Sequence, residues 1–288
     1  MAHSRAPTEL RHPGADRDCP RCKGTGTRIA RSGEVAIAIS CDCLSVCPSC
    51  RGTGLVAISN AFRARHRRCV CQVVMARRRA FDAAGIPARH SGSTRASFVP
   101  TGRHQTAVVG AVSNYLKEFN PEGDNRGLIL YGDVGRGKTH LLVALLRELV
   151  FRHGVRARFV EFSHLLADLK SGFDVGRGMA ALIDPLVDVE ILAIDELGKG
   201  RNTEFEGTVL DELVSRRYNA VRPILATTNF SPGGGGAAVS NAAAVQVGTE
   251  ERPGLATRVG PRVYSRLRET CDFVEVQGDD YREQRGRP

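Results

Sequence analysis

A glycine-rich loop between two apolar segments constrains this chain most strongly. Residues 127–131 read GLILY, residues 132–139 read GDVGRGKT, and residues 141–150 read LLVALLRELV. This order predicts a buried strand, a tight loop and a helix. The backbone N–H groups of the loop and the helix N-terminus would then converge on one point, which favours a bound phosphate.

The loop has the spacing G-x-x-x-x-G-K-[ST] of a nucleotide-binding phosphate loop. In this motif Lys138 reaches the β- and γ-phosphates, and the Thr139 hydroxyl ligates Mg²⁺. An ordinary glycine turn is the alternative, but the flanking strand and helix are the context that the motif requires. The predicted nucleotide-binding residues are Gly132, Asp133, Val134, Gly135, Arg136, Gly137, Lys138, Thr139 and His140.

The size and the cysteine content bound the class of protein. A chain of 288 residues can hold one α/β core and a smaller module. No apolar run approaches a membrane span, and the first residues lack the apolar core of a signal peptide. We therefore expect a cytoplasmic protein with reduced cysteines, without a membrane and without a disulfide framework.

The positive charge lies in the N-terminal part of the chain. Residues 1–126 carry 20 Lys and Arg against 9 Asp and Glu, a net charge of +11, whereas the rest carries 21 against 22, a net charge of −1. This asymmetry suggests a polyanion or an acidic partner. Eight zinc-bound thiolates would offset part of the charge, and a solvated arginine-rich surface is an equal alternative.

An internal repeat occupies residues 19–71. Each copy reads C-P-x-C-x-G-T-G, then a partly strand-like stretch, then C-x-C, and the second copy follows the first by 28 positions. In the first copy, residues 27–30 and 35–40 predict two β-strands about a turn. The repeated cysteines are Cys19, Cys22, Cys41 and Cys43, followed by Cys47, Cys50, Cys69 and Cys71.

Four thiolates in each copy suit a closed, tetrahedral Zn²⁺ site, so we expect about two Zn²⁺ per chain. A redox role or an iron–sulfur cluster is the alternative. The period favours one ion per copy. A crossed arrangement stays open, in which the first and last cysteine pairs bind one ion and the four cysteines between them bind the other. The C-x-x-C-x-G-x-G units resemble the zinc-binding repeats of the DnaJ co-chaperones, although C-x-C replaces their second pair and no His-Pro-Asp signature precedes them.

A basic run surrounds the last cysteines. Only Phe62 and Phe81 lie near it, whereas a face that binds single strands usually interleaves its charges with stacking aromatic rings. Electrostatic attraction to nucleic acid without base readout and a solvated connector both remain open. The run comprises Arg63, Arg65, His66, Arg67, Arg68, Arg77, Arg78 and Arg79.

Composition divides the chain into four parts. We expect a disordered N-terminus over 1–18, the tandem zinc module over 19–71, a linker over 72–104 and the ATPase domain over 105–288. A helix over 106–119 should open that domain, before the turn residues NPEGDN.

Strands and helices alternate after the phosphate loop. With 127–131, the expected strands make an α/β domain with a five-stranded parallel sheet. Residues 231–254, rich in Gly and Ala, predict a flexible insertion, and Cys271 is expected to be packed. The expected strands are 156–162, 187–194, 223–228 and 271–278, and the expected helices are 164–170, capped by Ser163, then 208–219 and 255–269.

Polar residues follow two of these strands. Asp195 and Glu196 end one apolar strand, where a parallel sheet binds its ligands, so Asp195 would hold Mg²⁺ and Glu196 would polarise the attacking water. The alternative is that two acids stabilise a helix dipole. Asn229 ends another strand and could contact both the γ-phosphate and the water, unless it only starts a turn.

From about residue 83 to 282 the chain resembles the AAA+ ATPases of the DnaC, DnaI and IstB group. The matching segments are AAGIPAR, LILYGDVGRGKTHL, FSHLLADLKSGF, ILAIDELG, LDELVSRRYN, ATTNF, RVYSRL and GDDYR. The resemblance implies ATP as the nucleotide, Walker A at 132–139, Walker B at Asp195 and Glu196, and sensor 1 at Asn229. It also implies a trans-acting arginine finger at Arg266, with Arg262 and Arg268 as rivals, and a second arginine sensor at Arg282.

The resemblance implies a DnaC-like, switch-like ATPase of low turnover that loads a replicative helicase. ATP would order a homo-oligomer around single-stranded DNA, the zinc module would bind the helicase, and hydrolysis would release it. An IstB-like helper of a transposase shares the same core. A zinc-dependent chaperone or adaptor with a vestigial nucleotide site is a third alternative, which intact Lys138, Asp195 and Glu196 disfavour.

Overall fold

The structure is a computed structural model that describes residues 10–60, 63–176, 178–201, 203–233 and 253–281. It comprises two compact units. One unit contains residues 1–97 and 143–158, and the other contains residues 98–142 and 159–288. None of the described helices combines the length and the apolar character needed to cross a membrane.

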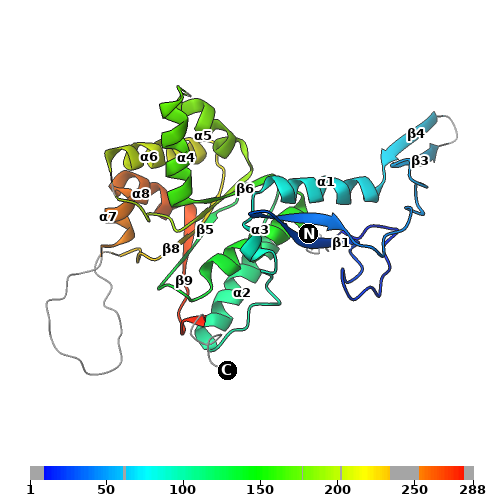
Figure 1. Cartoon of the computed structure of the whole chain (residues 1–288), viewed down its shortest axis with the longest axis horizontal. Helices are drawn as coiled ribbons and strands as arrows, with labels where there is room; N and C mark the ends of the chain where they lie inside the picture. Colours follow the sequence, from blue (N-terminus) through cyan, green and yellow to red (C-terminus); the bar gives the residue numbers. More distant parts are fainter. Residues whose placement is uncertain (1–9, 61–62, 177, 202, 234–252, 282–288) are drawn as a thin grey trace. The chain divides into compact units, whose positions relative to one another are not determined.

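The cysteine repeat forms two antiparallel hairpins, one in each copy (Figure 1). Strand β1 (Thr27–Ser32) pairs with β2 (Val35–Ser40), and β3 (Leu55–Asn60) pairs with β4 (Arg63–Arg68). The two predicted β arms of the first copy are therefore present, and Gly33, with φ of 56°, lies at the turn between them.

Helix α1 (Val70–Ala83) corrects the prediction that residues 72–104 are a linker. Val74 and Phe81 are buried on one side of this helix, and the Phe81 ring stacks on Phe151 with ring centroids 5.3 Å apart. A short 3₁₀ helix, η1 (Ala88–His90), follows. The helix was not predicted because its arginines suggested a segment exposed to water. In the structure Arg78 is buried instead, and it donates hydrogen bonds to the Thr27 and Ser40 hydroxyls.

The segment just before the first cysteine corrects a second prediction. Residues 10–18 were expected to be disordered, but the His12 amide donates to the Thr25 carbonyl at 3.1 Å, and the Ser45 amide donates to the Gly14 carbonyl at 2.9 Å. The loops around the cysteines supply the backbone partners that hold this segment. Residues 1–9 lie outside the described part of the chain.

The second unit confirms the predicted α/β fold with its five-stranded parallel sheet, whose strand order is β6-β7-β8-β5-β9. Strand β5 pairs in parallel with both β8 and β9, and β7 pairs in parallel with β8. Helix α3 (Lys138–His153) and β6 contribute residues to both units. The strands are β5 (Gly127–Tyr131), β6 (Ala157–Glu161), β7 (Ile191–Asp195), β8 (Ile224–Thr228) and β9 (Cys271–Glu275).

Helices pack their apolar sides against the sheet. The core includes Ile129, Leu192 and Ile194 from the strands, with Leu169 and Leu213 from helices. The remaining helices are α2 (Arg103–Glu118), α4 (Phe162–Asp174), α5 (Met179–Asp188), α6 (Glu204–Asn219), α7 (Leu255–Val259) and α8 (Pro261–Thr270).

Three predicted boundaries were wrong. Val187 ends α5 rather than starting a strand, because one apolar run contains the end of a helix and the beginning of β7. Ser163 lies inside α4 and donates to Glu161 Oε1 at 2.8 Å, so it does not cap this helix. The helix expected over 255–269 breaks at Gly260, where φ is 83°, and Pro261 starts α8. Most of the predicted 231–254 insertion lies outside the described residues.

Candidate functional site

The phosphate loop joins β5 to α3, as predicted. Lys138 opens α3, and its Nζ donates to the carbonyls of Gly132 and Asp133 at 2.8 and 2.7 Å. Burial lowers the pKa of Lys138 to about 8. The ammonium group therefore folds back over the loop, from which it could turn toward a phosphate.

Two glycines of the loop are required by backbone geometry. Gly132 has φ of 139°, and a Cβ there would lie 2.5 Å from the Val276 carbonyl oxygen. At Gly137, with φ of 84°, a Cβ would lie 2.6 Å from the Phe98 ring. Any other residue would strain the loop or push these neighbours away.

Phe98 is a neighbour of the loop that the sequence did not reveal. Its ring lies 5.7 Å from the His140 ring, centroid to centroid. An aromatic surface thus borders the residues predicted to bind nucleotide. Phe98 stands in the segment predicted as a linker, and nothing in its local pattern indicates this position.

The carboxylate at the end of β7 meets the helix that follows the loop. Thr139 Oγ1 donates to Asp195 Oδ1 at 2.9 Å, and Thr227 Oγ1, from β8, donates to the same oxygen at 2.5 Å. Burial raises the pKa of Asp195, and these two hydrogen bonds oppose that shift. A hydroxyl and a carboxylate oxygen in contact are ligands that Mg²⁺ accepts, so Thr139 and Asp195 could hold this ion.

Thr227 also positions the next residue of the site. The Glu196 amide donates to Thr227 Oγ1 at 3.0 Å, and Glu196 has φ of 57°, which is rare for a residue with a side chain. The Glu196 carboxylate pairs with Lys199. Helix α6 begins only at Glu204, so the two acids do not start a helix, which removes the helix-dipole alternative.

The other predicted residues differ in their surroundings. Asn229 is exposed and directly follows β8. Arg266 donates to Asp211 Oδ1 at 2.9 Å and to Ser215 Oγ at 2.7 Å, and its side chain is 20% exposed. The Arg262 side chain is 72% exposed, whereas the Arg268 guanidinium lies over the Phe273 ring. Arg282 lies outside the described residues.

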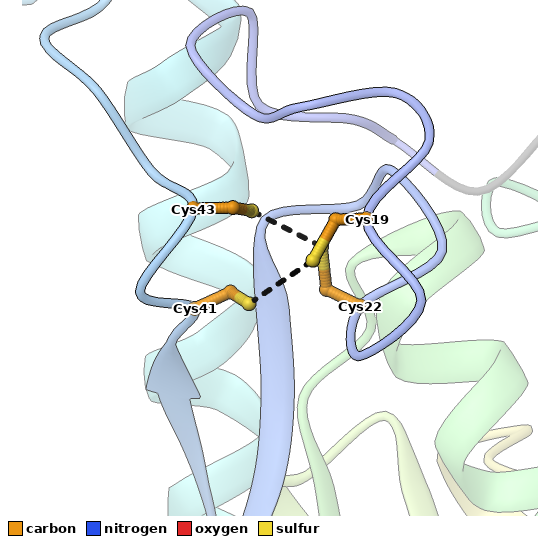
Figure 2. A group of neighbouring side chains, drawn as sticks. All are labelled: Cys19, Cys22, Cys41 and Cys43. Carbon is orange, nitrogen blue, oxygen red and sulfur yellow. Dashed lines mark hydrogen bonds between the residues drawn. The ribbon is translucent and has the colours of Figure 1, made fainter.

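The first cysteine cluster gathers both pairs of one repeat copy (Figure 2). Cys19 Sγ lies 3.8 Å from Cys41 Sγ, and Cys22 Sγ lies 3.5 Å from Cys43 Sγ. The edge of a tetrahedron with Zn–S bonds of about 2.3 Å measures about 3.8 Å, so these separations suit one tetrahedral metal ion. The Gly26 amide points at Cys22 Sγ from 3.3 Å, a contact that stabilises a thiolate.

The second cluster repeats this geometry. Cys47 to Cys69 and Cys50 to Cys71 are both 3.6 Å apart, sulfur to sulfur, and all four residues are buried. The backbone repeats as well, because Lys23 and Arg51, at equivalent positions, both have φ of 50°. Each cluster draws on one repeat copy, in agreement with the arrangement that the period favours over crossed pairing.

The comparisons with known proteins agree with the geometry of the second unit. A family model described as "IstB-like ATP binding protein" matches residues 115–246. The crystal structure of the DnaC helicase loader superposes with a TM-score of 0.54 at 25% identity, over 66% of this chain and 99% of that chain. This region is a DnaC/IstB-like AAA+ ATPase domain. A crystal structure of DnaI, at 18% identity and a TM-score of 0.50, has the same fold over 68% of this chain and 93% of that chain.

The sequence relatives of the AAA+ ATPase domain include a helicase loader and a protein of an insertion sequence. The replicative helicase loader DnaC of Escherichia coli K12 is 27% identical over 156 residues, which are 54% of this chain and 62% of that protein. A putative ATP-binding protein in an insertion sequence of Mycobacterium tuberculosis is 33% identical over 125 residues, 43% of this chain and 49% of that protein. The chain thus spans about half to three fifths of the length of these relatives.

Proposed function

We propose that this chain is an ATP-hydrolysing loader of a replicative helicase. The observation that carries the proposal is the Thr139–Asp195–Thr227 cluster beside the phosphate loop, in a domain similar to that of DnaC. Its hydroxyl and carboxylate oxygens suit the Mg²⁺ that accompanies a nucleoside triphosphate, and Thr227 also contacts Glu196, the residue that follows β7. Binding and hydrolysis of ATP can therefore be coupled at one place.

Each residue of the site has a role in this proposal. Lys138 and the loop amides bind the β- and γ-phosphates, while Thr139 and Asp195 hold Mg²⁺, which would neutralise charge on the phosphates. Glu196 orients the attacking water, and its backbone is fixed by Thr227. Asn229, exposed after β8, contacts the γ-phosphate and the water. Hydrolysis yields ADP and phosphate, and its turnover is slow because ATP serves as a switch.

The partners follow from the two kinds of site. The zinc-bearing repeat would bind the helicase, and the AAA+ domain would assemble into a homo-oligomer around single-stranded DNA. An arginine of α8 would complete the site of the neighbouring subunit. About two Zn²⁺ per chain, one in each cluster, would hold the repeat in shape.

A loading assay with the replicative helicase of the same organism tests this function. The full chain should place the helicase on single-stranded DNA, and Glu196→Gln should bind the helicase but release it poorly. Cys22→Ser combined with Cys50→Ser should abolish helicase binding while Cys271→Ser, outside both clusters, retains it. If neither the full chain nor Glu196→Gln retains the helicase in a pull-down, the loader proposal is wrong.

A helper of a transposase is the second candidate, favoured by the match to the insertion-sequence protein. The AAA+ site would be used in the same way, but ATP would control delivery of DNA to a transposase. A transposase gene beside the gene for this chain, and ATP-dependent retention of that transposase by the chain in place of the helicase, would select this candidate.

A further inference from the structure

The two copies of the cysteine repeat use their hairpins differently. In the first copy, β2 packs against α1. Ala36 of β2 is buried, and its amide donates to the Ile86 carbonyl at 2.7 Å. The Ala38 amide donates to Asp82 Oδ1 at 2.6 Å. The first hairpin is therefore a structural part of its unit.

The second hairpin carries arginines where the first carries packing residues. At the position 28 residues after Ile37 stands Arg65, and Arg67 replaces Ile39 in the same way. The side chains of Arg65, His66, Arg67 and Arg68 are exposed, and none of them hydrogen-bonds or ion-pairs with a described residue. We call these four residues the basic strand. No other described element packs extensively against β3 or β4.

The cysteine scaffold does not require this charge. The first copy builds the same hairpin and the same cluster geometry without it, and there Asp42 pairs with Arg21 at 2.5 Å and lies 3.7 Å from Arg28. In the second copy Val70 occupies the position of Asp42. Between Asp42 and Asp82 the chain has eight arginines and no Asp or Glu, so zinc-bound thiolates of the second cluster would offset only part of this positive charge.

The basic strand points to both sides of its hairpin. Arg65 and Arg67 lie opposite Ile58 and Val56 on one face, and His66 and Arg68 lie opposite Ala57 and Leu55 on the other. A protein partner usually covers one face with an apolar centre. A ribbon charged on both faces instead suits a groove lined with phosphates, and the major groove, about 12 Å wide, admits a two-stranded ribbon.

We infer that the basic strand, Arg65 to Arg68, is a nucleic-acid-binding arm that contacts phosphates. The described residues of the hairpin include no Phe, Tyr or Trp, so the inference concerns contact with phosphates and not stacking on bases. This site is separate from the nucleotide site and goes beyond the proposed function, because either a helicase loader or a transposase helper could use it.

Fluorescence anisotropy of the full chain with labelled DNA tests the inference. The probes are a duplex of about 30 base pairs and a single strand of equal length, titrated from about 0.05 to 0.3 M KCl. Arg65→Gln/Arg67→Gln/Arg68→Gln is compared with wild type. Arg17→Gln/Lys23→Gln/Arg89→Gln is the matched control, since it removes the same charge from exposed residues outside the basic strand.

Loss of three phosphate contacts should reduce the slope of log Kd against log salt by about 2.7 for the duplex and about 2.1 for the single strand. At about 0.1 M KCl the affinity should fall by at least about tenfold, and by much less in the control. The duplex losing more affinity than the single strand supports insertion into a groove, and equal losses support contact with the phosphates of either.

Zinc content and ATP hydrolysis equal to wild type should accompany this loss. If the triple variant loses zinc, the double variant Arg65→Gln/Arg67→Gln replaces it, because it leaves Arg68, the residue beside Cys69, unchanged. The double variant should show about two thirds of the slope change. An unchanged slope, an equal loss in the control, no DNA binding by the wild type, or displacement by polyglutamate but not by unlabelled DNA would overturn the inference. The last result would identify an acidic protein as the partner. Failure of helicase loading alone would leave the inference intact.

Discussion

Thr139 and Asp195 lie 56 positions apart in the chain and are joined by a hydrogen bond of 2.9 Å. This bond links the first turn of α3 to the carboxyl end of β7. It brings together the two side chains predicted to hold Mg²⁺. Thr227 donates to the same oxygen of Asp195, so two hydroxyls from different elements hold this carboxylate.

The double contact of Thr227 predicts a role in ATP hydrolysis. Thr227→Val keeps the shape of the side chain but removes the donor to Asp195 and the acceptor for the Glu196 amide. Hydrogen bonds to charged groups are worth about 1.5–3 kcal/mol, so kcat for ATP hydrolysis should fall roughly 10- to 100-fold. Thr227→Ser, which keeps the hydroxyl, should retain most of the activity. Wild-type turnover in the valine variant would contradict this role.

The lowered pKa of Lys138 predicts a pH dependence of nucleotide binding. In the free chain burial sets this pKa to about 8, and bound phosphates would raise it. Below pH 8 the ammonium group is already charged, so affinity for a fluorescent ADP should be constant. Above pH 8 binding must take up a proton, so affinity should fall by up to about tenfold per pH unit. Lys138→Arg, charged throughout, should show a flat profile where wild type declines, and two parallel profiles would refute the argument.

The cysteine clusters predict a metal content that elemental analysis can measure. Wild type should contain about two Zn²⁺ per chain. Cys22→Ser and Cys50→Ser should each lose one ion, because they belong to different clusters. Cys271→Ser is the control: burial raises the pKa of this thiol to about 11, and it lies outside both clusters. One ion per wild-type chain, or the loss of both ions from a single substitution, would contradict two independent sites.

Two arginines of α8 should affect different properties: substitution of Arg266 should lower stability, whereas substitution of Arg262 should affect hydrolysis. Arg266→Ala removes the contacts with Asp211 and Ser215, so it should lower the free energy of unfolding by about 1–2 kcal/mol. Arg262 is largely exposed, so Arg262→Ala should leave the melting temperature unchanged. If Arg262 acts in trans, its loss should slow hydrolysis by about a thousandfold.

A mixing experiment separates this trans role from a structural one. Arg262→Ala subunits and Glu196→Gln subunits, each inactive alone, should regain activity when mixed, because some interfaces then combine an intact Arg262 with an intact Glu196. If only Arg266→Ala subunits regain activity when mixed with Glu196→Gln subunits, Arg266 is the finger, as the resemblance implies, and Arg262 is not. Absence of complementation by either variant would argue against a trans arginine from α8.

Local spacing alone determined much of this protein. The phosphate loop, Asp195 and Glu196, and the eight repeated cysteines could be predicted because each motif keeps its functional groups within a few positions or one period. The α/β alternation followed from apolar runs. The boundary between α5 and β7 did not, because one apolar run contains both, and periodicity does not mark where the backbone changes.

Only the tertiary structure decided which distant residues meet. Thr227 reaches Asp195 because β7 and β8 are neighbours, and Phe98 covers Gly137 although it lies in a segment without a motif. The arginine run shows the same division. Its sequence is uniformly basic, yet Arg78 is buried among backbone and hydroxyl acceptors while Arg65 and Arg67 stay exposed. Spacing along the chain fixes which groups are available, and packing fixes which of them are used up inside the fold and which remain for a partner.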